Sequence, residues 1–206
     1  MRLLGVVGGA AALVICGLVR DRGKRLEPGL WAGWGGSPTV GRLRWRNADD
    51  PDAVRRLHAR INSLLDQPLP DPAAEAHDAL AADRRYEEAV ALLRERTRDT
   101  SSFRLVFAEN MEYGFRRNSL GLRPFALSIA GTAFVVSVAF LIWGRGDVAG
   151  RWARWGIACG ISAVLLVYWW RIVTPEWVRR AAELYADRLL EAVETLRTSE
   201  PRPTAG

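Results

Sequence analysis

A run of 19 residues without a charged side chain, Phe125–Trp143, constrains the fold of this chain more than any other feature. A helix needs about 20 apolar residues to cross the ~30 Å hydrocarbon core of a bilayer. A second run, Trp152–Val173, has 22 residues, and its charged side chains, Arg154 and Arg171, stand near its ends, where long side chains reach the interface. Aromatic residues flank both ends of the pair, as expected at membrane interfaces. The two runs therefore predict a transmembrane hairpin.

A third apolar run, Leu3–Val19, has 17 residues and is rich in Gly and Ala. A cleaved signal peptide is the alternative to a membrane anchor for such a segment. Four basic residues follow the run directly: Arg20, Arg22, Lys24 and Arg25. Charges in that place favour an uncleaved anchor. We therefore expect three transmembrane helices in an all-α membrane protein, and the retention of the first span stays open.

The distribution of basic residues predicts the topology, because loops with many Arg and Lys stay on the cytoplasmic side. Basic residues cluster after the first span, before the second and after the third. The connector between the second and third spans holds two, Arg145 and Arg151. We expect the N-terminus outside and the C-terminus in the cytoplasm. Lys24 is the only lysine among the 29 basic residues, and such a preference for arginine is typical of GC-rich bacterial genomes. Together with the predicted spans, it indicates a multi-pass protein of a bacterial inner membrane.

The net charge of +6 would suit a nucleic-acid partner, but its distribution does not. Residues 20–124 carry 19 basic and 16 acidic side chains, and the tail from residue 174 carries 5 and 6. The excess lies beside the spans, where membrane topology explains it. We expect a lipid bilayer as a partner and no nucleic acid.

The spans divide the chain into four parts: an N-terminal anchor (1–20), a cytoplasmic helical region (21–124), the two-span hairpin (125–173), and a cytoplasmic amphipathic helix with a disordered tail (174–206). In the helical region, Gly and Trp residues predict a loop over 26–47. Asp50-Pro51 predicts a helix start, and a second helix is expected from about Ala73 to Arg96. His58 and His77 lie on different helices, and two histidines are too few for a metal site.

A third amphipathic helix is expected after Thr100-Ser101, just before the second span. Its end mixes aromatic, acidic and paired basic residues, and these form the candidate contact site for lipid or a partner: Glu112, Tyr113, Phe115, Arg116 and Arg117. The two arginines would bind anionic headgroups. The alternative is a membrane-surface helix in which Glu112 and Arg116 form an ordinary i,i+4 pair.

Two Gly-x-x-x-Gly pairs lie in the spans, Gly5 with Gly9 and Gly156 with Gly160. Such pairs let helices approach closely in a bilayer, so they are candidates for span packing within one chain or in a homo-oligomer. Chance is the alternative, because glycine is common in spans. Cys16 and Cys159 differ by about 9 Å in their expected depth, too far for a disulfide, which needs Cα atoms within about 7 Å.

No catalytic constellation is recognisable in the sequence, and the spans hold no Asp, Glu, Lys or His. We therefore expect no enzyme, no cofactor and no metal, and no ion-coupled transporter. The layout of Phe103–Leu196 resembles in architecture the SLATT-type membrane effectors of bacterial conflict systems, which are thought to perturb the membrane. No motif matches residue by residue, and the extra first span departs from a two-span plan.

Two functional hypotheses follow. The first is a non-enzymatic, membrane-anchored interaction protein whose cytoplasmic helices bind a soluble protein or another copy of the chain. The alternative is a membrane-perturbing or pore-forming effector that acts through oligomerised hairpins, as the resemblance implies.

Overall fold

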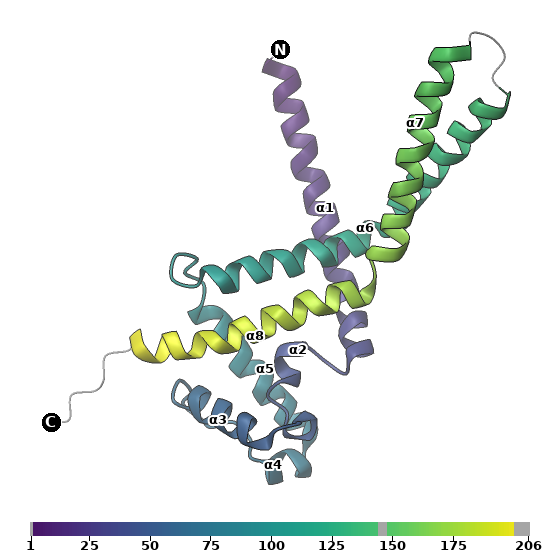
Figure 1. Ribbon diagram of the computed structural model, residues 1–206. Helices are drawn as coiled ribbons and strands as arrows, with labels where there is room; N and C mark the ends of the chain where they lie inside the picture. Colours follow the sequence, from purple (N-terminus) through teal and green to yellow (C-terminus); the bar gives the residue numbers. More distant parts are fainter. Residues whose placement is uncertain (1, 144–147, 200–206) are drawn as a thin grey trace. The chain divides into compact units, whose positions relative to one another are not determined.

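The computed structural model of the chain is all-helical, with 84% of residues in helices and no strand among the described residues (Figure 1). It describes residues 2–143 and 148–199, and within these the side chains of 2–12, 15, 148, 149, 151 and 197–199 lie outside the description. The elements are α1 (Arg2–Trp34), α2 (Pro38–Gly41), η1 (Trp45–Asn47), α3 (Pro51–Asn62), α4 (Pro72–His77), α5 (Ala79–Arg96), α6 (Arg104–Trp143), α7 (Val148–Val167), η2 (Tyr168–Ile172) and α8 (Pro175–Ser199). The all-α prediction is confirmed.

The chain divides into two compact units, and each is described by itself. The hairpin unit comprises Met1–Glu27 and Gly114–Val178, and the helical unit comprises Pro28–Tyr113 and Arg179–Gly206.

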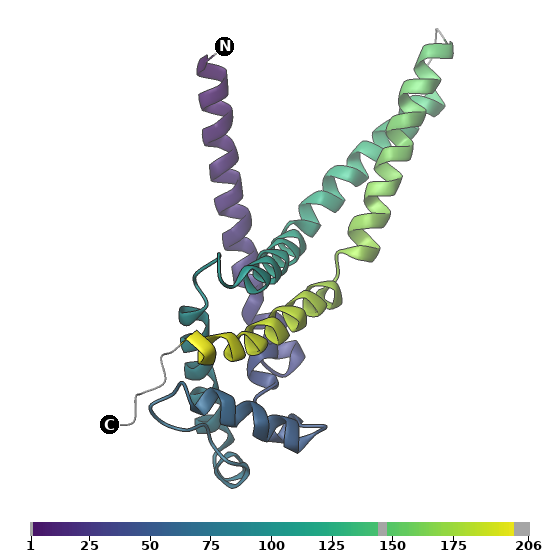
Figure 2. The same cartoon turned by 60° about the vertical axis from the view of Figure 1, so that its left-hand side comes forward.

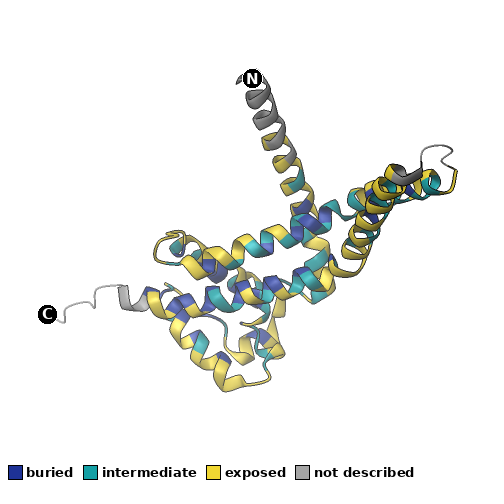
Figure 3. Cartoon of the chain, turned by 45° about the horizontal axis from the view of Figure 1, so that its top comes forward, coloured by how far each residue is buried: buried dark blue, intermediate teal, exposed yellow. Residues whose placement is uncertain are grey.

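In the hairpin unit, two described helical segments are long and apolar enough to cross a membrane, within Arg104–Trp143 and Trp152–Ile172. Only 11% and 6% of their most apolar stretches are buried, as the exposed colouring of the hairpin shows (Figure 3). The core helix of a soluble protein would be mostly buried instead. The third predicted span, Leu3–Val19, lies in α1, but the side chains of most of its residues fall outside the description.

Small side chains let the two arms of the hairpin approach each other. Ala130, Ser137 and Ser162 are buried there, and each serine hydroxyl donates a hydrogen bond to the carbonyl four residues earlier in its own helix. The rings of Phe140 and Trp155 stack with centroids 4.3 Å apart. Close packing of small residues is the expected way for helices to associate in a bilayer.

The helix α1 crosses α6 at a pair of glycines (Figure 2). A Cβ atom added to Gly121 would lie 3.2 Å from the backbone nitrogen of Gly23. Arg22 donates from Nε to the Gly121 carbonyl at 3.0 Å, and its guanidinium lies over the ring of Phe125. The absence of side chains at the two glycines is what allows this close approach.

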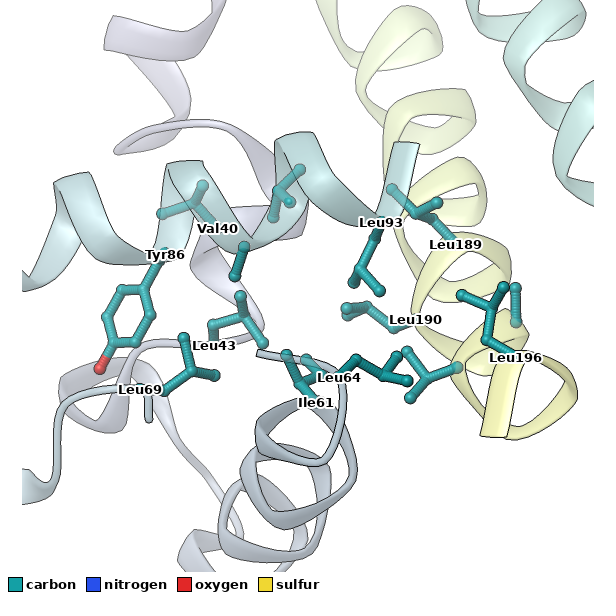
Figure 4. Close-up of a cluster of buried hydrophobic side chains, with 14 of the residues drawn as sticks. Val40, Leu43, Ile61, Leu64, Leu69, Tyr86, Leu93, Leu189, Leu190 and Leu196 are labelled. Carbon is teal, nitrogen blue, oxygen red and sulfur yellow. The ribbon is translucent and has the colours of Figure 1, made fainter. Parts of the chain in front are cut away.

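The helical unit packs around one apolar core, to which α2, α3, α5, α8 and the start of α6 contribute (Figure 4). Leu43, Ile61, Tyr86, Leu93 and Leu189 are almost completely buried in it. Aspartates cap three of its helices: the Asp50, Asp71 and Asp78 side chains accept hydrogen bonds from backbone N–H groups in the first turns of α3, α4 and α5.

Three predicted boundaries differ from the structure. The predicted loop over 26–47 is largely helical, because α1 continues to Trp34 and α2 follows. Glycine weakens a helix without ending it, and α1 ends at Gly35 and Gly36, which have positive φ. The single helix expected over 73–96 is split, because Asp78 caps a new helix, α5. The helix expected after Ser101 and the second span form one continuous helix, α6, with Pro124 inside it.

Candidate functional site

The predicted contact residues at the end of the amphipathic segment do not share one surface. In the helical unit, Tyr113 is buried and its ring is parallel to that of Tyr185, with centroids 6.5 Å apart. In the hairpin unit, Arg117 is buried and pairs with Glu27 at 3.1 Å. Phe115 is 58% exposed.

Arg116 acts with a second arginine at the joint between α7 and α8. Its Nη1 donates to the carbonyl oxygen of Trp177 at 3.1 Å, and its guanidinium lies 5.0 Å from the centre of the Trp177 indole. Arg123 donates from Nη2 to the carbonyl of Trp170 at 3.0 Å. Both arginines therefore bind backbone carbonyls of the segment that leads from α7 into α8. Glu112 is half-buried.

Helical geometry explains this scatter. Consecutive residues turn by about 100° around the axis, so a six-residue stretch points in every direction. Composition singled out the stretch. In the structure, positions 106, 113 and 117 are buried and positions 107, 111 and 115 are exposed.

A groove of about 780 Å³ lies within the helical unit, between the turn after α1, the start of α3 and the polar face of α8. This volume falls within the ~300–1,000 Å³ range typical of ligand pockets. The apolar part of its lining includes Trp34, Ala53, Leu57 and Leu190. Sequence reasoning missed it, because its walls come from segments about 140 residues apart.

Charged residues on the groove wall are largely paired across or along it. Arg42 contacts Asp187 at 3.0 Å, and Arg179 contacts Glu183 at 2.9 Å. Such partly exposed pairs contribute roughly 0–1 kcal/mol each. The groove therefore has a mixed, nearly balanced lining that neither sign of charge dominates.

A buried carboxylate, Glu75, organises the other polar site of the helical unit. It is 3% exposed and accepts hydrogen bonds from the Tyr86 hydroxyl at 2.6 Å and from the backbone N–H of Trp45 at 2.9 Å. The backbone N–H and the guanidinium of Arg46 donate to it at 3.1 and 3.0 Å. Burial acts to raise the pKa of Glu75, but these hydrogen bonds outweigh it, and the pKa lies below its ordinary value.

The neighbours of Glu75 complete a closed network. Asp83 accepts from Arg44 at 2.8 Å and from Arg46 at 2.7 Å. Burial, and then the hydrogen bond to Glu75, raises the pKa of Tyr86 far above its ordinary value. This network ties the segment around η1 to α4 and α5.

His58 is buried and forms a hydrogen bond through Nε2 to the carbonyl of Leu43 at 2.8 Å. Burial lowers its pKa, so the ring is neutral. It packs against Trp45 and Tyr86 rather than near His77, which is exposed. Within the part of the chain that the structure describes, no cluster of three metal-ligating side chains occurs. The polar side chains of the network hydrogen-bond to one another, Glu75 to Tyr86 and Arg46, and Arg46 to Asp83.

The structure describes the surroundings of one of the two Gly-x-x-x-Gly pairs. Gly156 and Gly160 are exposed on α7, and a Cβ at either would meet no described atom within 4 Å. They therefore do not mediate the packing of α7 on α6. Gly5 and Gly9 lie in α1, where side-chain surroundings fall outside the description. Cys16 and Cys159 are free thiols, as predicted.

Comparison of the chain with family models, curated proteins and solved structures finds no match. These comparisons therefore do not support the architectural resemblance to SLATT-type effectors.

Proposed function

We propose that this chain is a non-enzymatic interaction protein anchored in a bacterial inner membrane, with its helical unit in the cytoplasm. The exposed hairpin supports the anchoring. Only 11% and 6% of the most apolar stretches of its two arms are buried, and a bilayer would cover the exposed apolar side chains. The basic residues beside the spans support an outside N-terminus and a cytoplasmic C-terminus.

The groove of the helical unit is the observation that carries the interaction function. It is formed by a unit with its own packed core, so its walls are held in place before any partner binds. Its apolar floor at Leu57 and Leu190, under a rim of paired charges, suits the burial of a few side chains of a cytoplasmic protein or of another copy.

Site-specific photo-cross-linking in cells tests this proposal. A photoreactive amino acid at Ala53, an exposed groove residue, should give a covalent adduct in the membrane fraction. The same amino acid at Glu87, exposed on α5 and outside the groove, serves as the matched control and should give none. Equal labelling from both positions, or recovery of the chain in the soluble fraction, would contradict the proposal.

The membrane-perturbing function is a second candidate, favoured by the open glycine face of α7. A Cβ atom added at Gly156 or Gly160 would meet no described atom within 4 Å. If copies of the chain pack through this face, the double Gly→Leu variant should assemble about tenfold less, since overpacking costs about 1–3 kcal/mol. Cross-linking in membranes measures the assembled fraction.

The control for this prediction is the double variant Leu165→Ile and Leu166→Ile, farther along the same helix, which should assemble normally. Liposomes carrying the unaltered protein should leak ions, and those carrying the glycine variant should leak less. Unchanged cross-linking of the glycine variant would rule out packing through this face.

A further inference from the structure

The crossing of α1 and α6 lies at one depth relative to both spans. Gly23 follows Val19, the last residue of the first apolar run, by four residues, and Gly121 precedes Phe125, the first residue of the second, by four. At 1.5 Å per residue, both glycines stand about 6 Å from the ends of their apolar runs. The headgroup layer of a bilayer is about 5–8 Å thick on each side. If the spans cross a bilayer, the crossing falls within this layer.

The surface around the crossing is basic. Arg20, Lys24 and Arg25 are exposed on α1. Asp21 is the exposed acidic residue of this segment, since Glu27 is paired with Arg117. The basic residues thus keep an excess of positive charge at headgroup depth.

Exposed apolar side chains lie on α6 near the crossing. Phe115 is 58% exposed, with its ring against the edge of the Trp177 indole. Phe125 is 51% exposed, and the guanidinium of Arg22 from α1 lies over its ring. Ile129, in the span, is 71% exposed. Exposed apolar side chains beside Arg and Lys are typical of helices that lie in the membrane interface.

We propose that the crossing of α1 and α6 is a binding surface for anionic phospholipids, with Arg20, Lys24 and Arg25 contacting their phosphates and Phe115 inserted among the headgroups. This inference rests on the proposed membrane anchoring. It replaces Arg116 and Arg117 as anion ligands, because Arg117 is paired with Glu27 and Arg116 with the Trp177 carbonyl. Bound anionic lipids would thereby stabilise the contact between α1 and α6.

Spin labels in reconstituted vesicles test the depth. With Cys16 and Cys159 replaced by Ser, single cysteines are introduced and labelled at Val135 in the span, at Phe115, and at exposed Glu87 as an aqueous reference. Collision with oxygen and with a water-soluble nickel complex then reports depth. We expect Val135 in hydrocarbon, Phe115 in the headgroup layer and Glu87 in water.

Lipid selectivity tests the charge. The protein should immobilise spin-labelled phosphatidylglycerol in preference to phosphatidylcholine. A basic residue near a membrane surface contributes about 1 kcal/mol, a factor of about five for a lipid that it contacts, so Arg20→Gln, Lys24→Gln and Arg25→Gln together should reduce the preference severalfold or abolish it. A charge-retaining variant, Arg20→Lys with Arg25→Lys, should keep it. Changing Arg55, Arg84 and Arg98, exposed in the helical unit, to Gln is the control for net charge and should leave it unchanged.

The outcomes separate the two proposals. A label at Val135 that collides freely with the nickel complex would overturn the membrane anchoring and the lipid surface together. A label at Val135 in hydrocarbon, with Phe115 in water or lipid selectivity unchanged in the Gln variant, would overturn the lipid surface alone. Spin–spin broadening at Phe115 would show that another copy covers this face, and would also overturn it.

Discussion

Replacing Glu75 by Ala should destabilise the helical unit by about 3–5 kcal/mol, the largest effect we expect from a single side chain in this unit. The substitution removes the acceptor for the Tyr86 hydroxyl and for two backbone N–H groups, all enclosed beside the core. A buried donor without a partner costs about 1–3 kcal/mol. Urea unfolding of the full chain in detergent micelles measures the loss, and hydrogen exchange at Trp45 and Arg46 should increase.

The effect should depend on pH. Because the folded-state pKa of Glu75 is below its ordinary value of 4.5, its ionised form stabilises the fold above pH 4.5. That contribution is lost as the pH falls through the lower folded-state pKa. The stability difference between the unaltered chain and the Glu75→Ala variant should therefore narrow in acid below pH 4.5.

The control for Glu75→Ala is Glu88→Ala on α5, which removes an exposed carboxylate that pairs with Arg85. It should cost less than about 1 kcal/mol. Equal effects of the two substitutions at neutral pH would show that the Glu75 network does not hold the segment around η1.

The sequence predicted the helices that depend on short-range features, such as a capping residue or an uninterrupted apolar run. Asp50-Pro51 marked the start of α3, because a capping side chain and a proline favour a first helical turn wherever they stand. The amphipathic helix expected after residue 174 is α8. The runs Phe125–Trp143 and Trp152–Val173 correspond to the two long apolar helices, since length and charge are read directly from the chain.

The polar network and the groove depend on contacts that local signals do not encode. Glu75 stands in a polar stretch with no periodicity, and only the return of the chain around Trp45 makes it a buried acceptor. In the amphipathic helix expected after Thr100-Ser101, the neighbouring apolar residues Val106 and Phe107 differ, because the structure buries the first and exposes the second. Packing against α8 selects between such neighbours, and its register cannot be read from one sequence.

Glycine positions show the same limit. The Gly-x-x-x-Gly spacing drew attention to Gly156 and Gly160, which are open, whereas a close backbone approach in the hairpin unit involves Gly23 and Gly121. Neither of these has another glycine four residues away, so the spacing rule does not mark them.

Replacing Gly23 by Ala should separate α1 from α6. The added Cβ would lie 2.2 Å from Oδ1 and 2.9 Å from Cα of Asn118, and the second atom belongs to the backbone and cannot swing away. Relief requires the helices to move apart, which strains the Arg22–Gly121 hydrogen bond and the Arg117–Glu27 pair. Overpacking of this kind costs about 1–3 kcal/mol, and Gly23→Leu should cost more.

Gly17 and Gly29 on the same helix provide controls in which the substitution by alanine should not destabilise the protein. A Cβ at either position meets no described atom within 4 Å. There alanine only improves helix propensity, by up to about 1 kcal/mol, so Gly17→Ala and Gly29→Ala should be neutral or stabilising. Thermal unfolding in detergent and proteolysis at Arg20–Arg25 measure all three variants. Asn118→Ala should rescue Gly23→Ala only in part, since it removes Oδ1 and leaves Cα. If Gly23→Ala were as stable as Gly29→Ala, α1 would not cross α6 at this glycine.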